Sequence, residues 1–427
     1  MHAHRSFVGS VVLLLALGSG DAFATVRYVN NDGICGGNLP CYTTLAAAIA
    51  ASSAGDEIRV QPGLYNTAAM ITVDRPLLIL GPQAGVNALP SQGSTRVPGD
   101  ATSEGILDGG GVLGTIVRIT ASDVEINGLE IRNGTGDLVD SPASLALARV
   151  TIRNNIIHGS SGDEGVQLRN VADALIECNR VYGTAGDGIN LCCGATNGII
   201  RFNELHDIAS LDAAVYVYNS TNTTIEGNLV YRTANNEAIK LGAKNGSDAA
   251  GTGGVILNNR VYDLKQDGVA VYQSNTEVRC NEIYNSTSEN GGIYLAYAIS
   301  NVSVEDNYVH DNTFNTAKWG DPAGIMIGTA VNAPSITVTG NRLVNNSPNG
   351  ATNRAVGLLT ARNNWWGAAD GPGPVGPGSG DLVSTNIDFT PWLTSAPAPS
   401  CPSVGSCGTT PTPSLQKSWG QIKLLYR

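Results

Sequence analysis

The stretch Ile176–Tyr182 reads IECNRVY, and Ile200–His206, 24 residues further on, reads IRFNELH. Each has an aliphatic residue first, Asn fourth and an apolar residue sixth, an alternation of apolar and polar residues that is typical of a half-buried strand. The pattern recurs along the chain at intervals of 24, 24, 25, 31, 22, 26 and 34 residues, with its asparagines at Asn155, Asn179, Asn203, Asn228, Asn259, Asn281, Asn307 and Asn341.

A second, shorter element precedes each copy of this pattern. It reads small–apolar–x–apolar, as in Gly165–Leu168 (GVQL), Gly188–Leu191 (GINL) and Ala238–Leu241 (AIKL). Neither element is long enough to bury its apolar face alone, but stacked coils pair every strand with its copies above and below at ~4.8 Å. The sequence therefore predicts an all-β fold, a single-stranded right-handed parallel β-helix (solenoid).

Three columns of equivalent residues, one residue per coil, are expected to stabilise the fold rather than to bind a ligand. Stacked side-chain amides hydrogen-bond along the axis, so the asparagines are expected to form a ladder at one corner. Two residues before each Asn, an outward column alternates in charge over four coils (Arg153, Glu177, Arg201, Glu226) and fixes the register. The three histidines of the third column lie on non-adjacent coils and cannot share one zinc ion, so a stacked surface ladder is expected for His158, Tyr182, His206, Tyr231, Tyr262, Tyr284 and His310.

The composition favours a folded protein that does not bind nucleic acid. Of 427 residues, 42% are hydrophobic, which is enough for a large core, and only 14% are charged, below the ~25% of ordinary domains. The formal net charge is −11 and no basic stripe offsets it, so phosphates would be repelled.

Residues 1–24 are typical of a signal peptide. Arg5 provides the positive region, Val11–Leu17 the apolar region, and Ala22–Ala24 the small–x–small cleavage site. We therefore expect a secreted or cell-surface protein whose mature chain begins at Thr25. No later apolar run reaches the ~18 residues of a transmembrane helix, and a monomer is expected.

The remaining chain divides by composition. Residues 25–105 are predicted to hold the N-terminal cap and first coils, with the alanine-rich, helix-prone Thr44–Ser53 as a helical cap. Residues 106–367 are the repeats, and 368–393 are a C-terminal cap in which tryptophans close the last coil. Residues 394–416, rich in Pro, Ser, Thr and Gly, are interpreted as a linker, and 417–427 as a C-terminal tail.

The chain has eight cysteines, and export into an oxidising compartment would allow them to form disulfides. Cys35 is expected to bond with Cys41, and Cys401 with Cys407, because each pair is close in sequence. Cys178 and Cys280 share a repeat position four coils apart, ~19 Å at the strand spacing, which is too far for a disulfide. Apart from this exclusion, the state of Cys178, Cys192, Cys193 and Cys280 is left open.

The repeat, the opening Ala54–Tyr65 (AGDEIRVQPGLY) and the closing Asn363–Gly367 (NNWWG) and Pro391–Leu393 (PWL) resemble bacterial secreted right-handed β-helix repeat proteins of the pectate-lyase-like superfamily. The resemblance covers about residues 26–393. It implies the fold, whereas the superfamily holds lyases, hydrolases, epimerases and adhesins. No Asp-Pro-His-Asp motif of alginate epimerases is present, and Gly186–Ile189 (GDGI) matches one polygalacturonase fragment without its partner motifs.

One outward face gathers the candidate functional residues. Its tyrosines, Tyr216, Tyr218, Tyr272 and Tyr294, are expected to contact substrate, with Trp319 in the loop Asp311–Ala323. A row of acids just before the strands, on four successive coils, is the candidate metal set: Asp187, Asp212, Glu237 and Asp267.

Three interpretations of this face remain open. In the first, the acids bind Ca²⁺ and Lys240 is the base of a uronate polysaccharide lyase, as the resemblance permits. In the second, the face binds an extracellular polysaccharide without breaking it. In the third, the acids are turn residues that accept hydrogen bonds from their own backbone, the tyrosines cover the sheet, and the protein is a structural or adhesin β-helix. We favour polysaccharide binding for the face as a whole, and the turn interpretation for any single acid.

Overall fold

The computed structural model describes residues 24–210, 212–234, 237–243, 245, 251–318, 320–398, 401–403 and 405–407. The chain divides into two compact units, Thr25–Thr412 and a second unit made of Met1–Ala24 with Pro413–Arg427. The expected signal peptide, apart from Ala24, and the expected tail lie outside the described residues. In the part of the chain that is described, no helix is long and apolar enough to cross a membrane.

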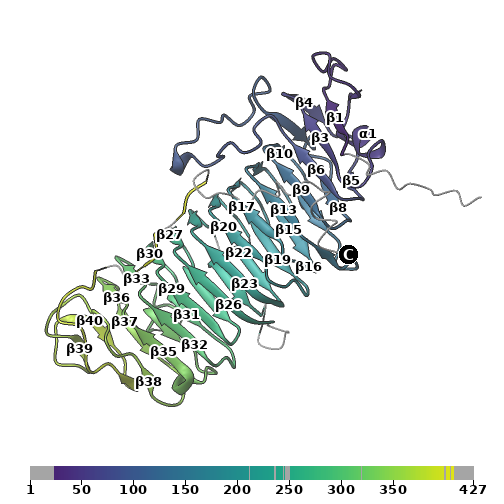
Figure 1. Ribbon diagram of the computed structural model, residues 1–427. Helices are drawn as coiled ribbons and strands as arrows, with labels where there is room; N and C mark the ends of the chain where they lie inside the picture. Colours follow the sequence, from purple (N-terminus) through teal and green to yellow (C-terminus); the bar gives the residue numbers. More distant parts are fainter. Residues whose placement is uncertain are drawn as a thin grey trace, which may run out of the picture. The chain divides into compact units, whose positions relative to one another are not determined.

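Three long parallel sheets run the length of the larger unit (Figure 1). Sheet A has 15 strands: β1 Val26–Val29, β2 Cys41–Tyr42, β3 Asp56–Val60, β6 Leu77–Leu80, β9 Val124–Asn127, β13 Val150–Arg153, β17 Leu175–Glu177, β20 Ile199–Arg201, β23 Ser220–Glu226, β26 Gly251–Leu257, β29 Thr276–Arg279, β32 Val302–Glu305, β35 Ile336–Thr339, β38 Leu359–Thr360 and β41 Ile387–Asp388.

Sheet B has 11 strands: β4 Gly63–Asn66, β7 Gly105–Asp108, β10 Glu130–Arg132, β14 Ile156–His158, β18 Arg180–Tyr182, β21 Glu204–His206, β24 Leu229–Tyr231, β27 Arg260–Leu264, β30 Glu282–Ser286, β33 Tyr308–His310 and β36 Arg342–Val344. Sheet C has 13: β5 Ile71–Val73, β8 Val117–Ile119, β11 Val139–Ser141, β15 Val166–Arg169, β19 Ile189–Cys192, β22 Ala213–Tyr218, β25 Glu237–Gly242, β28 Val269–Tyr272, β31 Gly291–Leu295, β34 Ala323–Ile327, β37 Asn349–Asn353, β39 Pro372–Pro374 and β40 Gly380–Val383.

The remaining elements are short. Strands β12 (Leu147–Ala148) and β16 (Val171–Ala172) form a two-stranded sheet, and the helices are α1 (Leu45–Ala50), η1 (Pro90–Gln92) and η2 (Ala333–Ser335). Thr44 caps α1 by accepting a hydrogen bond from the Ala47 backbone, and α1 contacts β1, β2 and β5 through a buried face. Its expected role as a cap over the open end stays a prediction.

Each coil contributes one strand to sheet C, then to sheet A, then to sheet B, so the predicted right-handed parallel β-helix is confirmed. Ile176, Ile200 and Ile225 of sheet A pair in register and are fully buried, which shows how one apolar position per coil builds a continuous core. At the C-terminal end Trp366 is also fully buried in this core.

The asparagine ladder is confirmed at the corner between sheets A and B. Asn179 Oδ1 accepts hydrogen bonds from both the backbone N–H and the Nδ2 of Asn155, at 3.0 and 3.1 Å, while Asn179 Nδ2 donates to Asn203 Oδ1 and to the Ile152 carbonyl. The same pattern continues to Asn364, one coil beyond the predicted set. These bonds satisfy buried backbone groups at this corner without a hairpin.

The two other predicted columns also stack. The rings from His158 to His310 lie face to face, with centroids 4.6 to 5.2 Å apart between neighbouring coils. In the charged column, Arg201 pairs with Glu177 at 2.7 Å, and Arg153 lies 3.7 Å from the same carboxylate.

The disulfides differ from the prediction in one respect. The Cys35–Cys41 bond is confirmed and Cys178 is not bonded to Cys280, as expected. The expected Cys401–Cys407 bond is wrong, because Cys407 bonds to Cys178, Cys401 bonds to Cys280, and Cys192 bonds to Cys193.

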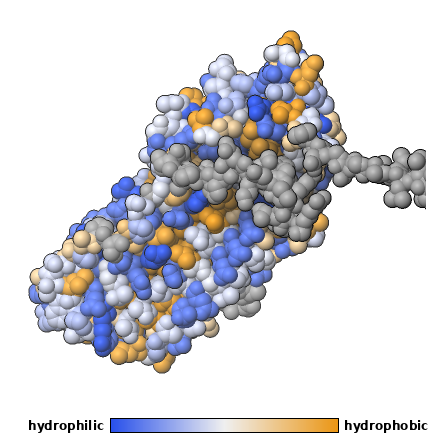
Figure 2. All heavy atoms as spheres, viewed as in Figure 1, coloured by the Kyte–Doolittle hydropathy of each residue, from blue (hydrophilic) through white to orange (hydrophobic). Residues whose placement is uncertain are grey.

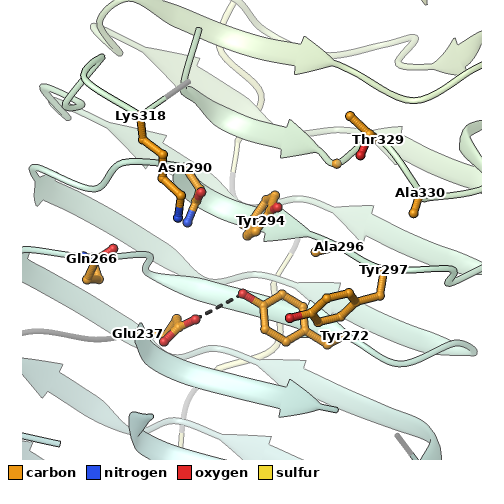
Figure 3. Close-up of a pocket in the computed structure, with 11 residues that line it drawn as sticks. Glu237, Gln266, Tyr272, Asn290, Tyr294, Ala296, Tyr297, Lys318, Thr329 and Ala330 are labelled. Carbon is orange, nitrogen blue, oxygen red and sulfur yellow. Dashed lines mark hydrogen bonds between the residues drawn. The ribbon is translucent and has the colours of Figure 1, made fainter. Parts of the chain in front are cut away.

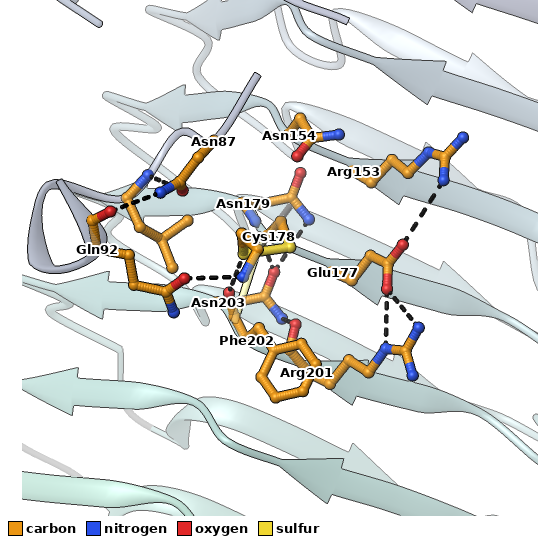
Figure 4. The surroundings of a disulfide bond; sticks show 12 residues. Asn87, Gln92, Arg153, Asn154, Glu177, Cys178, Asn179, Arg201, Phe202 and Asn203 are labelled. Atoms are coloured by element: carbon orange, nitrogen blue, oxygen red, sulfur yellow. Dashed lines mark hydrogen bonds and ion pairs between the residues drawn. A yellow bond between two sulfur atoms is a disulfide. The ribbon is translucent and has the colours of Figure 1, made fainter. Parts of the chain in front are cut away.

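The geometry explains the error. Four coils separate Cys178 from Cys280, ~19 Å, and the six residues from Cys401 to Cys407 span about 20 Å when extended. The C-terminal segment therefore fits along the stack as a strap with one disulfide at each end. Figure 4 shows the Cys178 end, where the loop that carries Gln92 also arrives, and Gln92 Oε1 accepts a hydrogen bond from the Cys407 backbone at 2.8 Å.

Candidate functional site

Sheet C places the predicted face in one register. Its outward column pairs Gln167 with Asn190, Asn190 with Tyr216, Tyr216 with Lys240, and Lys240 with Ala270, each on the next coil. The column continues through Tyr294 to Met326. Because side chains alternate across a strand, the residue two positions later in each strand points the same way, which puts Tyr218 and Tyr272 in a second column beside the first.

Lys240 lies at the centre of this face. Its Nζ is 3.8 Å from Asp212 Oδ1 and 3.8 Å from Glu237 Oε1, and it sits over the rings of Tyr216 and Tyr272, 5.0 and 5.3 Å from their centroids. Only 7% of the Lys240 side chain is exposed. We call these five residues the Lys240 site: a cation held between two aromatic faces and two carboxylates.

The tyrosines differ in their surroundings. Tyr216 is buried and its hydroxyl has no hydrogen-bond partner, while the Tyr272 hydroxyl donates to Glu237 Oε1 at 3.1 Å. Burial raises the pKa of both phenols, and that of Tyr294 to about 12, so all three are neutral at physiological pH. The Tyr218 ring lies 5.9 Å from that of Tyr216.

A cavity of about 470 Å³ opens beside the Lys240 site, and we call it the tyrosine pocket. Figure 3 shows Tyr272 and Tyr297 with their rings side by side, Glu237 bonded to Tyr272, and Tyr294 on the neighbouring strand. The ring centroids of Tyr272 and Tyr297 are 4.8 Å apart, and Lys318 contributes a cation to the lining. The pocket thus combines aromatic walls with charged groups at its edge.

Tyr297 and Lys318 were not predicted from the sequence. Tyr297 has a φ of 64°, a left-handed conformation that is unusual for a bulky residue, and Lys318 lies in an insertion. Trp319, the predicted aromatic of that insertion, lies outside the described residues. Over the described residues on the visible side, Figure 2 shows hydrophilic and hydrophobic patches interspersed.

The four predicted metal ligands do not converge on one point. Asp187 and Asp267 are three coils apart, ~14 Å at the strand spacing, whereas ligands of one calcium ion lie about 2.3–2.6 Å from it. Asp187 accepts hydrogen bonds from Asn190 Nδ2 at 2.7 Å and from the Ala213 backbone at 3.0 Å. Burial raises its pKa to about 6.

Asp267 occupies an equivalent turn. It is fully buried, accepts hydrogen bonds from Asn290 Nδ2 at 2.8 Å and from the Gly291 backbone at 3.2 Å, and burial raises its pKa. These contacts are those of a turn residue. Asp212 and Glu237, in contrast, face Lys240.

A different group of carboxylates does converge. Atoms of Asp137, Asp163 and Glu164 all lie within 4.8 Å of one another near the start of β15, three coils before Lys240. Burial and the neighbouring carboxylates raise the pKa of Glu164 far above its usual range, and its Oε2 is buried without a hydrogen-bond partner. The residues fit a divalent cation, which would relieve the crowding of like charges.

Comparison with known proteins agrees with this architecture. Residues 111–247, 140–287 and 251–366 match the family described as "Right handed beta helix region". No curated protein matches the sequence significantly.

Among solved structures, the A-module of the mannuronan C-5 epimerase AlgE6 of Azotobacter vinelandii is 16% identical, with a TM-score of 0.53 over 83% of this chain and 93% of that one. DFA-IIIase of Arthrobacter chlorophenolicus A6, solved in complex with GF2, is 14% identical, with a TM-score of 0.52 over 85% of this chain and 92% of that one. At these identities the likeness shows the fold alone.

Proposed function

We propose, given that the chain belongs to the right-handed β-helix family, that sheet C binds an extended extracellular polysaccharide, with the Lys240 site and the tyrosine pocket at its centre. The observation that carries the proposal is the pocket of about 470 Å³, walled by Tyr272, Tyr294 and Tyr297 beside a buried cation. Small-molecule sites are usually lined by aromatic and apolar side chains together with a small number of polar groups that orient the ligand.

The protein's location enters the same proposal. Four disulfides join all eight cysteines, and disulfides persist in oxidising compartments outside the cytosol. A secreted or surface protein would meet polysaccharides there. The structures of similar fold include an epimerase named for mannuronan, which supports a carbohydrate ligand by analogy of fold.

A second candidate function is lyase chemistry with Lys240 as the base. Its placement supports this, because Lys240 lies on the outward face of sheet C, where Asp212 and Glu237, each 3.8 Å from Nζ, hold the side chain in position. In this candidate function the calcium ion lies away from Lys240. The carboxylate cluster of Asp137, Asp163 and Glu164 would hold the ion ~14 Å away, and would act on a different sugar unit.

The experiment is a polymer panel, neutral and uronic, scored for retention and for new unsaturated or reducing ends. We expect retention of at least one polymer by the wild-type chain, and weaker retention by Tyr294→Ala. Release of unsaturated ends would establish the lyase. A wild-type protein that retains no polymer would contradict the proposal.

Paired substitutions of Lys240 separate its two roles. Lys240→Arg keeps the positive charge but cannot act as a base, because guanidinium is not deprotonated in proteins. If Lys240 is a base, Lys240→Arg loses turnover and retains the polymer, whereas Lys240→Ala weakens both. If it is only a contact, Lys240→Arg binds within a few-fold of the wild type. A chelator and Glu164→Gln test the cation in the same assay.

A further inference from the structure

The Cys192–Cys193 disulfide joins adjacent residues at the end of β19, on the face that carries the Lys240 site. Cys192 pairs with Arg169 on the coil before and with Tyr218 on the coil after. It points the same way as Asn190, two residues earlier in the strand. The disulfide therefore lies in the second column of sheet C, two coils from Lys240.

The turn that holds Cys193 has a backbone conformation that asparagine adopts on the flanking coils. Cys193 has a φ of 67°, and the residues at the same turn position on the flanking coils are Asn170 and Asn219, with φ of 54° and 45°. Asn adopts this left-handed conformation readily, whereas most other side chains are strained in it. The other such exception in sheet C among the described residues is Tyr297 (φ 64°), which lines the tyrosine pocket.

Beside the disulfide, three consecutive coils carry polar atoms without partners. Gln167 Oε1, Asn190 Oδ1 and the Tyr216 hydroxyl are buried and lack a hydrogen bond, and the three residues are 7, 6 and 2% exposed. They succeed one another in the outward column. A hydrogen bond left unmade at a buried group destabilises the fold, so three such groups in one line are a feature that a ligand would relieve.

The amides are oriented by the acids beneath them. Gln167 Nε2 donates to Glu164 Oε1 at 3.2 Å, and Asn190 Nδ2 donates to Asp187 Oδ2 at 2.7 Å. Each carbonyl oxygen is therefore the free end of its amide. Free acceptors require a donor, so hydroxyl groups suit this line and carboxylates do not.

We propose that the Cys192–Cys193 disulfide and the line Gln167, Asn190 and Tyr216 form a second sugar subsite. The two sulfurs, with the Tyr218 ring, pack against the C–H face of a neutral hexose unit, while its hydroxyls donate to the amide oxygens and bond the phenol. A sulfur pair is polarisable and nearly free of hydrogen-bonding capacity, which suits the apolar side of a sugar. Because Gln167, Asn190 and Tyr216 are only 7, 6 and 2% exposed, binding at this subsite requires their side chains to rotate outward.

This inference rests on the proposed function, because the subsite extends the same bound chain. From Tyr294 in the pocket to Cys192 there are four coil steps, ~19 Å. A short oligosaccharide would fill the pocket alone, and a longer one would reach the disulfide. Affinity should therefore rise with oligosaccharide length.

The test uses β-1,4-glucan and galacturonate oligosaccharides of two to six units, titrated into the full chain by calorimetry. The variant is Cys192→Ala with Cys193→Asn, which restores at this turn the residue that Asn170 and Asn219 supply. We expect its melting temperature to fall by no more than a few degrees. Its affinity for the longest glucans should fall roughly tenfold, the size expected for about 50 Å² of lost apolar contact. Affinity for the shortest glucans should not change.

Gln167→Met, which keeps the length of the side chain, removes one acceptor and should also weaken only the long glucans. If both variants keep the full gain with length, the subsite is refuted while the proposed function stands. If affinity rises with length only for the galacturonate oligosaccharides, the proposal that the subsite binds a neutral sugar is refuted. If the wild type binds neither series and retains no polymer of the panel, both proposals fail.

Discussion

At the residue scale, the sequence predicted the positions of the central side chains and not their partners. Periodicity alone places Tyr216 and Lys240 on adjacent coils of one face, because side chains alternate along each strand. It cannot say which acids turn outward. Asp187 is drawn into its turn by the Ala213 backbone and Asn190, whereas Asp212, one coil later, reaches Lys240.

Tyr297 and the Asp137 cluster escaped prediction for a related reason. Both lie where strands turn into loops, and there the backbone conformation rather than the repeat directs the side chain. A signal did exist in the sequence for Tyr297: it occupies a turn position that Asn219 fills on another coil.

Tyr216→Phe isolates a single hydroxyl. Because the phenol oxygen is buried without a partner, its removal should leave the free energy of unfolding unchanged or raise it by about 1 kcal/mol. The same change should weaken retention of the bound polysaccharide by roughly three- to tenfold, the worth of one hydrogen bond. Chemical denaturation and binding measured on one preparation give both values. A variant that loses stability and keeps its affinity would show that the hydroxyl serves the fold.

At the element scale, eight members of the asparagine ladder were predictable because one residue type recurs at one place in eight coils. The interval of about 24 residues fixes the coil, and an amide is both donor and acceptor, so it can bond to its own copies. The end of the ladder, Asn364, was missed because the NNWWG segment does not follow the repeat pattern.

Asn228→Ala should destabilise the protein by about 2–5 kcal/mol. The change removes the acceptor of two hydrogen bonds, from the Asn203 backbone N–H and from Asn203 Nδ2, and the donor to the Ile200 carbonyl. Asn228→Asp is the matched control for cavity formation, because it preserves the side-chain size. It keeps the acceptor for Asn203 but turns an oxygen toward Asn259 Oδ1, so it should destabilise by a similar amount. Urea unfolding measures both, and an Asp variant as stable as the wild type would argue against the ladder.

At the scale of the whole molecule, buried acids set the pH dependence of stability. Burial raises the folded-state pKa of Asp187 and of Asp381 to about 6, above the value of 3.8 for a free side chain. Between these values the folded state binds more protons than the unfolded state, so stability falls as pH rises from about 4 to 6. Below about pH 4, the carboxylates that pair with arginine, such as Asp207, lose their contribution.

Stability should therefore be greatest near pH 4, with a melting temperature several degrees above that at pH 7.5. Asp381→Asn keeps an oxygen to accept the Asn346 hydrogen bonds and cannot ionise, so its profile should be flatter over this range. Calorimetry across pH 4–8 checks both, and a wild-type melting temperature that rises steadily from pH 5 to 8 would contradict the assignment.

The fold as a whole was the most predictable feature and the strap the least. Stacking follows from the repeat, but Cys401 and Cys407 carry no repeat, and nearness in sequence favoured a local loop. The matching lengths of six extended residues and four coils, both about 20 Å, were the available signal.

The strap also determines what happens when the backbone is cut. Cys178–Cys407 encloses residues 179–406, and Cys280–Cys401 encloses 281–400 within them. A protease that hydrolyses one peptide bond in the outer stretch releases nothing, because the two halves stay joined through sulfur. In the inner stretch two such links bridge the cut. The severed ends remain tethered beside their native neighbours, and a nicked molecule keeps sheet C assembled for as long as its disulfides stay oxidised.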